Sequence, residues 1–242
     1  MNSSKLKIEI WSDVVCPFCY IGKRNFELAL EKFQAKDKIE VEWKAFQLEP
    51  DFIQDKNQKQ DLTDALAQKY NRSRAEIEQM QQQIIQTAKS VGLEYDFDKA
   101  IRFNTFDAHR IISKAKEKGL DDKAEETFFK AYFTDGLDLG DNTVITEVSK
   151  KIGLTEEDIK DALENDKYAY EVRKDIQESQ EIGVRGVPFF VLDRKFGVSG
   201  AQPVEAFTQT LEKAYEDWSQ KQQNIPLDIS QGSSCSIDGN CD

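Results

Sequence analysis

The chain has 242 residues, and its 33 Lys and Arg residues against 45 Asp and Glu residues give a formal net charge of −12 at pH 7. This acidic balance argues against a nucleic-acid partner and against an anionic membrane partner. The sequence contains no run of about 18 apolar residues, so no membrane span is expected.

Two alternating segments flank a helical one near the N-terminus. Residues 6–12 alternate apolar and polar side chains with a period of two, which is typical of a half-buried strand. Residues 17–35 repeat apolar side chains at helical spacing, and residues 39–46 alternate again. The order predicted here is therefore strand, helix, strand.

The motif Cys16-Pro17-Phe18-Cys19 lies between the first strand and the helix. Pro17 suits the first helical position, where its missing N–H costs nothing. Cys16 then sits at the helix N-terminus, where the dipole and the unpaired N–H groups favour a thiolate. Cys19 lies on the same helix face and can close a disulfide with Cys16. The arrangement predicts thiol–disulfide exchange, with a more exposed Cys16 as nucleophile and a more buried Cys19 as resolving thiol.

Further along the chain, a helical block precedes two more strands. Residues 50–59 are polar and mark a boundary, and residues 61–180 have a helical pattern throughout, with Thr155 as a capping residue. Strand patterns return at residues 188–192 and 196–199. A closing helix follows, whose apolar face comprises Val204, Phe207, Leu211 and Tyr215.

Strands at both ends of the chain, with helices between them, predict a discontinuous domain interrupted by an insertion. We expect a sheet-containing domain in residues 1–60 and 181–222 and a helical insertion domain in residues 61–180. Residues 223–242 are expected to form a flexible tail that contains Cys235 and Cys241.

Four segments together resemble the DsbA-like thioredoxin superfamily, and within it the FrnE-type branch that is grouped with 2-hydroxychromene-2-carboxylate isomerases. They are residues 12–19, 104–110, 186–190 and 196–202. The resemblance implies an α/β protein with a thioredoxin fold and a large all-helical insertion domain. It also implies a protein dithiol–disulfide oxidoreductase.

Pro188 heads an apolar segment, and proline is allowed as the first residue of a strand. In the thioredoxin fold, a cis proline at this place faces the Cys-x-x-Cys motif and leaves the preceding backbone available to a substrate. We therefore expect a cis Val187–Pro188 bond and a catalytic platform at Pro188. Pro17, Phe18 and Val187 are then expected to contact the substrate.

Two further residues are candidates for the site. Asp13 precedes Cys16 by three positions; it either assists proton transfer at Cys19 or is a solvated carboxylate at the strand end. His109 is the only histidine in the chain. It binds a peptide or tripeptide thiol if it faces the site, as the isomerase relatives suggest, and is otherwise a structural residue.

Three readings of the cysteines stay open beside the main one. Cys235 and Cys241 are an auxiliary redox pair, as a second pair in the FrnE-type branch suggests, or spare thiols in a frayed tail. A glutathione-dependent isomerase of an aromatic small molecule is disfavoured, because those relatives hold serine where this chain has Cys16. A zinc-stabilised holdase would use all four cysteines, but a Pro-initiated helix is unlike the turns of zinc knuckles, so no metal site is expected.

The expected partners follow from the thiol chemistry. Substrates would be protein or peptide thiols and disulfides, recycled by glutathione or a thioredoxin-type system, and no cofactor is needed. The sequence starts without an apolar signal segment, and catalytic thiols fit a reducing compartment, so a cytoplasmic protein is expected. The motif leaves open whether the protein oxidises, reduces or isomerises disulfides. The apolar Pro17-Phe18 dipeptide lacks the histidine common in DsbA-like relatives, which disfavours strong oxidising power.

Overall fold

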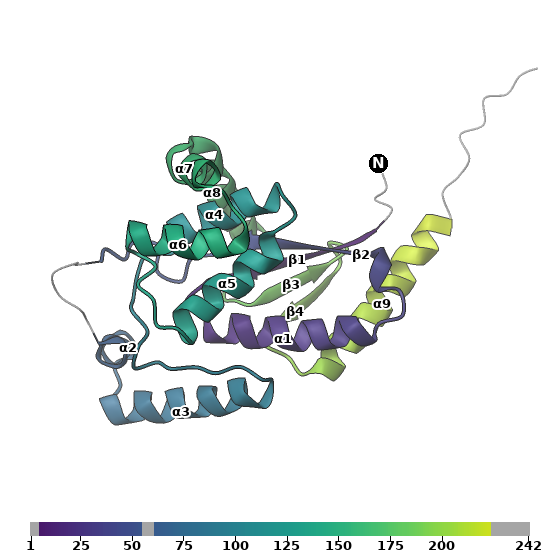
Figure 1. The fold of residues 1–242 in the computed structure, drawn as a ribbon. Helices are drawn as coiled ribbons and strands as arrows, with labels where there is room; N and C mark the ends of the chain where they lie inside the picture. Colours follow the sequence, from purple (N-terminus) through teal and green to yellow (C-terminus); the bar gives the residue numbers. More distant parts are fainter. Residues whose placement is uncertain (1–4, 55–60, 224–242) are drawn as a thin grey trace, which may run out of the picture.

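The computed structural model describes residues 5–54 and 61–223 of the chain. Its centre is a four-stranded sheet in the order β2-β1-β3-β4 (Figure 1). The strands are β1 (Leu6–Ser12), β2 (Ile39–Ala45), β3 (Phe189–Leu192) and β4 (Phe196–Ser199). β1 pairs in parallel with β2 and antiparallel with β3, which in turn pairs antiparallel with β4. The strands predicted at the two ends of the chain therefore form one sheet.

One face of this sheet is covered by α1 (Pro17–Lys32) and α9 (Val204–Gln223), which pack against each other (Figure 1). Every second residue of β1 points into this layer. The centre of the layer is an aromatic cluster of Phe26, Phe190 and Phe207, whose ring centroids lie 4.6 to 5.8 Å apart. Because the cluster joins α1, β3 and α9, it ties the N-terminal part of the chain to the C-terminal part.

Seven helices lie between β2 and β3 in the described part of the chain, after the short 3-10 helix Lys36–Lys38 that precedes β2. They are α2 (Leu62–Tyr70), α3 (Arg74–Ser90), α4 (Phe106–Lys116), α5 (Asp121–Phe133), α6 (Asn142–Ile152), α7 (Glu156–Glu164) and α8 (Asp166–Glu181). α5 and α8 contact β2, whereas α2 and α3 lie beyond the N-terminal end of α1 (Figure 1). The helices follow the expected insertion between the strands, although the exact domain boundaries stay a prediction.

Two sequence expectations are corrected by the structure. The helical pattern does not hold throughout residues 61–180, because residues 91–105 form turns and irregular backbone between α3 and α4. Gly92, at a φ of +80°, ends the helical course, and Phe97 and Phe103 are buried from this irregular segment. β1 is also more than half buried, because its second face is covered as well. Trp11 on that face is buried, and its indole N–H donates to the carbonyl of Asp175 on α8 (2.9 Å).

Helix capping follows the sequence closely. Thr155 accepts a hydrogen bond from the backbone N–H of Asp158, and the Asp158 carboxylate in turn accepts one from the Thr155 N–H, which confirms the predicted cap. On the closing helix, Phe207 and Leu211 are buried as expected. In the described ranges, no helix is long and apolar enough to cross a membrane.

A close approach between α1 and the segment before β3 determines where the predicted site lies. Gly22 in α1 faces the ring of Pro188, and a Cβ at Gly22 would lie 2.9 Å from Pro188 Cγ. Since carbon atoms do not approach so closely, only glycine lets the Pro188 segment reach the first turns of α1. The ring is closed onto the backbone nitrogen, so Cγ can shift only by a change of ring pucker and cannot swing away as the end of a flexible side chain would.

Replacing Gly22 with alanine should lower the free energy of unfolding by about 1–2 kcal/mol. Overpacking costs about 1–3 kcal/mol, and the better helix propensity of alanine offsets about 0.5–1 kcal/mol of this. Urea unfolding of the reduced protein measures the change. Gly186→Ala is the matched control, because a Cβ there meets no atom within 4 Å. Equal stability of the Gly22 variant and the wild type would contradict the packing argument.

Candidate active site

The two thiols of the motif lie at the first turn of α1. Cys16 is the N-cap residue, Pro17 is the first helical residue, and the N–H of Cys19 donates to the carbonyl of Cys16 (3.0 Å). Both cysteines are free thiols. They belong to the apolar core of the helical block and not to the core between the sheet and α9. The predicted redox motif is therefore placed at the junction of the two parts of the fold.

The exposure of the thiols follows the expected order, but both thiols are buried. Cys19 is 1% exposed and Cys16 is 4% exposed. Cys16 is covered because Val187 and the helices α2 and α3 contribute to the same cavity wall. The Cys16 sulfur is therefore reached through a cavity and does not lie on an open surface.

The segment before β3 lies against the Cys16 sulfur. The Cys16 thiol donates to the Val187 carbonyl at 3.4 Å, and the Val187–Pro188 peptide bond is cis, as expected. The Pro188 carbonyl accepts a hydrogen bond from the Gly200 N–H (2.8 Å), which fixes the segment to the end of β4. Val187 and Pro188 are thus brought to the dithiol from a part of the sequence more than 160 residues away.

Cys16 lines a cavity of about 330 Å³ between the dithiol and α2–α3. Apolar side chains dominate the wall that faces the motif: Leu62, Leu66, Ile77, Met80, Ile84, Phe103 and Phe133. Pro17, Phe18 and Val187 line the cavity as well, so three of the predicted substrate-contacting residues share it with Cys16. Phe18 is 44% exposed and stands at the surface. The volume is at the small end of the range of ligand sites, about 300–1,000 Å³.

His109 does not line this cavity. It is buried on α4, and its Nε2 lies 3.3 Å from Asp13 Oδ1. The expectation that His109 contacts a thiol substrate does not fit this position, because the buried Asp13 side chain lies against the ring. Asp13 is fully buried too, and its second oxygen accepts the backbone N–H of Leu48 (2.7 Å), so it is not the solvated carboxylate that one reading allowed.

A second buried acid, Glu125 on α5, lies behind the dithiol and was not found from the sequence. Its Oε2 accepts a hydrogen bond from the Ser12 hydroxyl at 3.3 Å, and Glu125 is 1% exposed. The Ser12 hydroxyl also interacts with the Cys19 thiol. A signal was available: Glu125 precedes Phe128 and Phe129 by three and four positions, which puts it on the apolar face of the helix.

Burial dominates the electrostatics of these groups. It raises the pKa of the Cys19 thiol well above its usual range; the adjacent Cys16 adds to the rise and the Ser12 hydroxyl opposes it. Burial also raises the pKa of Glu125 to about 7, although the charges of His109 and Lys23 oppose the shift. At His109 burial disfavours the charge, but the Asp13 carboxylate outweighs it and raises the pKa. Cys19 therefore keeps its proton near neutral pH, while Glu125 titrates there.

Tyr95, in the irregular segment between α3 and α4, is a further residue at the site. Its hydroxyl donates to the carbonyl of Pro17 at 2.8 Å. Its ring stacks on Phe133 with a centroid distance of 4.6 Å, which holds the hydroxyl in place. The turn of the motif is therefore fixed by the helical block. Burial raises the pKa of Tyr95, so the hydroxyl stays a hydrogen-bond donor across the neutral range.

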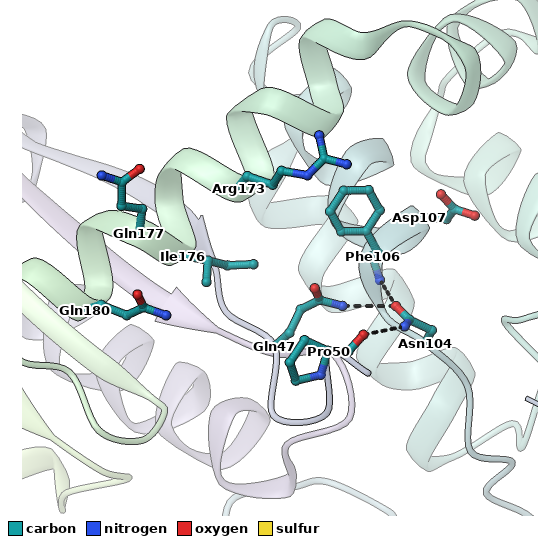
Figure 2. A pocket seen from close by; sticks show the side chains of 9 residues that line it. All are labelled: Gln47, Pro50, Asn104, Phe106, Asp107, Arg173, Ile176, Gln177 and Gln180. Atoms are coloured by element: carbon teal, nitrogen blue, oxygen red, sulfur yellow. Dashed lines mark hydrogen bonds between the residues drawn. The ribbon is translucent and has the colours of Figure 1, made fainter. Parts of the chain in front are cut away.

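A larger cavity has a volume of about 660 Å³ (Figure 2). It shares a wall with the Cys16 cavity. Gln47 and Asn104 line the larger cavity, whereas their chain neighbours Leu48 and Thr105 line the Cys16 cavity. The wall is held by hydrogen bonds from Gln47 Nε2 to Asn104 Oδ1 and from Asn104 Nδ2 to the Pro50 carbonyl, both 3.0 Å. Amide groups surround much of this second cavity, and no cysteine lines it.

The C-terminal cysteines cannot be placed against this site, because Cys235 and Cys241 lie outside the described residues. Their expected role as an auxiliary pair stays a prediction. Across residues 5–54 and 61–223, no group of three or more His, Cys, Asp or Glu side chains is arranged to hold a metal ion.

Comparisons with known proteins agree with this geometry. A family model described as a DSBA-like thioredoxin domain matches residues 7–212. The structure is similar to that of a probable DsbA oxidoreductase from Streptomyces coelicolor, with a TM-score of 0.82 and 36% identity over 98% of both chains. The uncharacterized protein YwbO of Bacillus subtilis is 28% identical over 88% of this chain and 98% of its own length.

A more distant structure shows the fold alone. The cytosolic disulfide reductase DsbM of Pseudomonas aeruginosa has a TM-score of 0.59 and 14% identity, and the match covers 90% of this chain and all of DsbM. The predicted thioredoxin fold with a helical insertion is confirmed by these matches. The chain therefore belongs to the family of DSBA-like thioredoxin domains.

Proposed function

We propose that this protein is a dithiol–disulfide oxidoreductase that exchanges disulfides with protein or peptide substrates through Cys16 and Cys19. The observation that carries the proposal is the placement of the Cys16 thiol at the N-terminus of α1, 3.4 Å from the Val187 carbonyl. The sulfur thus meets a backbone group beside Pro188 that an extended substrate can share. Glutathione or a thioredoxin-type protein is the proposed recycling partner, and a cytoplasmic location stays a prediction.

In the reducing direction, the Cys16 thiolate attacks one sulfur of the substrate disulfide. The substrate S–S bond breaks, a mixed disulfide with Cys16 forms, and the second substrate sulfur leaves as a thiolate. Cys19 then attacks the Cys16 sulfur, which releases the first substrate sulfur and leaves a Cys16–Cys19 disulfide. The substrate gains the two electrons that the dithiol loses. The oxidising direction is the reverse.

Cys19 must lose its proton before it attacks, and burial opposes that loss. The Ser12 hydroxyl connects Cys19 to Glu125, so a proton can pass from the thiol through Ser12 to the Glu125 carboxylate. The nearby Asp13–His109 pair keeps its own hydrogen bonds and acts on the relay through its charge. Glu125 is thus assigned as the proton acceptor for resolution, a role that the sequence had offered to Asp13.

The cavity itself favours a second candidate, chemistry on a small molecule. Cys16 opens into an enclosed and mainly apolar space of about 330 Å³, which suits an aromatic ligand. An isomerase that uses glutathione would act here without net oxidation. An assay with glutathione and a hydroxychromene substrate decides between the two, because turnover without disulfide reduction favours the isomerase.

The Cys16→Ser variant should lose insulin-disulfide reduction completely, because Cys19, the other thiol described at the site, is buried and keeps its proton. The Cys19→Ser variant should instead accumulate a mixed disulfide between Cys16 and the substrate, which mass spectrometry detects. Circular dichroism checks that both variants keep the fold. Retained turnover in the Cys16 variant contradicts the proposed function.

The Glu125→Gln variant should resolve the mixed disulfide at least about tenfold more slowly at pH 7, since general base catalysis is typically worth about 10²–10⁴-fold. In the wild type, the resolution rate should rise with pH through about 7, where Glu125 becomes a carboxylate. Rapid-quench decay of the mixed disulfide measures the rate. Glu147→Gln, on the exposed side of α6, is the control. An unchanged rate and pH profile in the Glu125 variant would remove Glu125 from the mechanism.

The raised pKa of Glu125 also predicts how stability depends on pH. The folded protein holds this proton more tightly than the unfolded chain does, so the free energy of unfolding should fall as pH rises from about 4.5 to about 7. The ionised acid costs up to about 3 kcal/mol at pH 8. Urea unfolding should show Glu125→Gln to be more stable than the wild type at pH 8 and nearly equal at pH 4.5. A difference independent of pH would contradict this assignment.

A further inference from the structure

The hairpin of α2 and α3 covers Cys16, and an ion pair attaches this hairpin to the rest of the protein. The hairpin places apolar side chains toward the cavity, among them Leu66, Ile77 and Ile84. At the end of α2, Lys69 Nζ donates to Glu49 Oε1 at 2.7 Å. Lys69 and Glu49 both line the Cys16 cavity. This ion pair therefore joins the cover of the cavity to its opposite wall.

Glu49 is held in place from the other side. Its Oε2 accepts a hydrogen bond from Arg102 at 2.8 Å, and the Arg102 guanidinium lies over the ring of Phe52, 4.3 Å from its centroid. Arg102 is the more buried of the two cations, at 17% side-chain exposure against 38% for Lys69. The Glu49–Arg102 half of the cluster is thus the fixed half, and Lys69 is the exchangeable partner.

The hairpin also has internal contacts that let it move as a unit. Thr63 on α2 donates to Gln81 on α3 at 3.1 Å, and Arg74 at the start of α3 pairs with Asp61 and Asp64 at the start of α2. These bonds persist if the hairpin separates from the body. Opening would break the Lys69–Glu49 pair and would also separate the apolar side chains of the hairpin, such as Ile84, from the core that contains Cys16.

We propose that the Lys69–Glu49 ion pair latches the α2–α3 hairpin over Cys16, so that the latched enzyme prefers small disulfides and opens to accept disulfides held in proteins. The proposal rests on the proposed disulfide exchange at Cys16. A cavity of about 330 Å³ admits the arm of a small disulfide, whereas a protein chain that crosses Cys16 needs the space occupied by α2. Glu49 is in this view a residue that determines substrate size.

The charge of the latch fits the rest of the molecule. The chain carries a net charge of −12, yet two cations and one anion meet at this side of the cavity. An acidic group on a substrate can therefore compete with Glu49 for Lys69. Substrate binding and latch opening then become linked, because the same ammonium group serves both.

The experiment compares the access of two alkylating reagents to Cys16. Iodoacetamide is small, and a maleimide on a long polyethylene glycol chain is bulky; peptide mapping by mass spectrometry restricts the readout to Cys16. In Lys69→Met, the ratio of bulky to small modification rates should rise about two- to fivefold, the range that an exposed ion pair shifts an equilibrium. Glu49→Gln should change the ratio in the same direction. The wild-type ratio should rise toward the variant value at high salt.

Glu147→Gln is the matched control, since Glu147 pairs with Lys150 on α6, outside the cavity. An unchanged ratio in Lys69→Met overturns the latch, and so does a change in Glu49→Gln alone, which would point to Arg102. Because alkylation needs no turnover, these outcomes are independent of the proposed function.

Insulin and a small disulfide as paired substrates then test selectivity: the ratio of the insulin rate to the small-disulfide rate should rise in both variants. If neither substrate is turned over, disulfide exchange is contradicted. The alkylation result on access to Cys16 is not affected by that outcome.

Discussion

The contact between Gly22 and the Pro188 ring is the constraint on which the site depends. Cys16 and Cys19 belong to the first turn of α1. An isolated helix turn can bind a thiol only through its own backbone groups. Because Gly22 lacks a side chain, the segment before β3 can lie directly on α1 and bring the Val187 carbonyl to the Cys16 sulfur. A local property of the sequence, one glycine in a helix, thus produces a site made from both ends of the chain.

The helical insertion completes the site from the other side. It supplies Glu125 behind Cys19, the Tyr95 hydroxyl on the Pro17 carbonyl and the hairpin over Cys16. Glu125 and the Tyr95 hydroxyl are polar groups in a largely apolar core, where an unpaired donor or acceptor would be costly. Each is paired with a group of the sheet-containing part, Glu125 with Ser12 and Tyr95 with Pro17. The chemistry of the dithiol and the docking of the insertion consequently depend on the same few hydrogen bonds.

The sequence predicted those features that repeat or that belong to a short motif. The alternation in residues 6–12, the Cys16–Cys19 spacing and the proline at position 188 each have a local cause, and the structure contains the strand, the helix start and the cis bond. The burial of Cys16 could not be predicted, because it results from helices placed about fifty residues later. The irregular segment 91–105 was missed because Phe103 precedes Phe106 by three positions, which is the spacing of one helix face.

The polar part of the site shows a different limit. Lone acids such as Asp13 and Glu125 look like surface residues in a chain with 45 of them, and only tertiary packing makes them buried. The position of Glu125 on an apolar helix face was the available signal. The single histidine suggested a role in substrate binding because of its side-chain chemistry. In the structure, its ring contacts Asp13 and does not line the Cys16 cavity.

The segment that carries Val187 is held at both ends, and this explains how a non-helical stretch can define a reactive geometry. At its far end, the Gly200 N–H binds the Pro188 carbonyl. At its near end, α8 is fixed to the sheet: the Lys44 ammonium binds Asp175 (2.8 Å) and Glu178 (3.1 Å). Lys44 lies on β2, which pairs with β1 immediately before the motif. The strand that leads into Cys16 and the helix that leads toward Val187 are therefore both anchored to the edge strand β2, so the sheet supports the short distance between the thiol and its carbonyl partner that the Gly22–Pro188 contact permits.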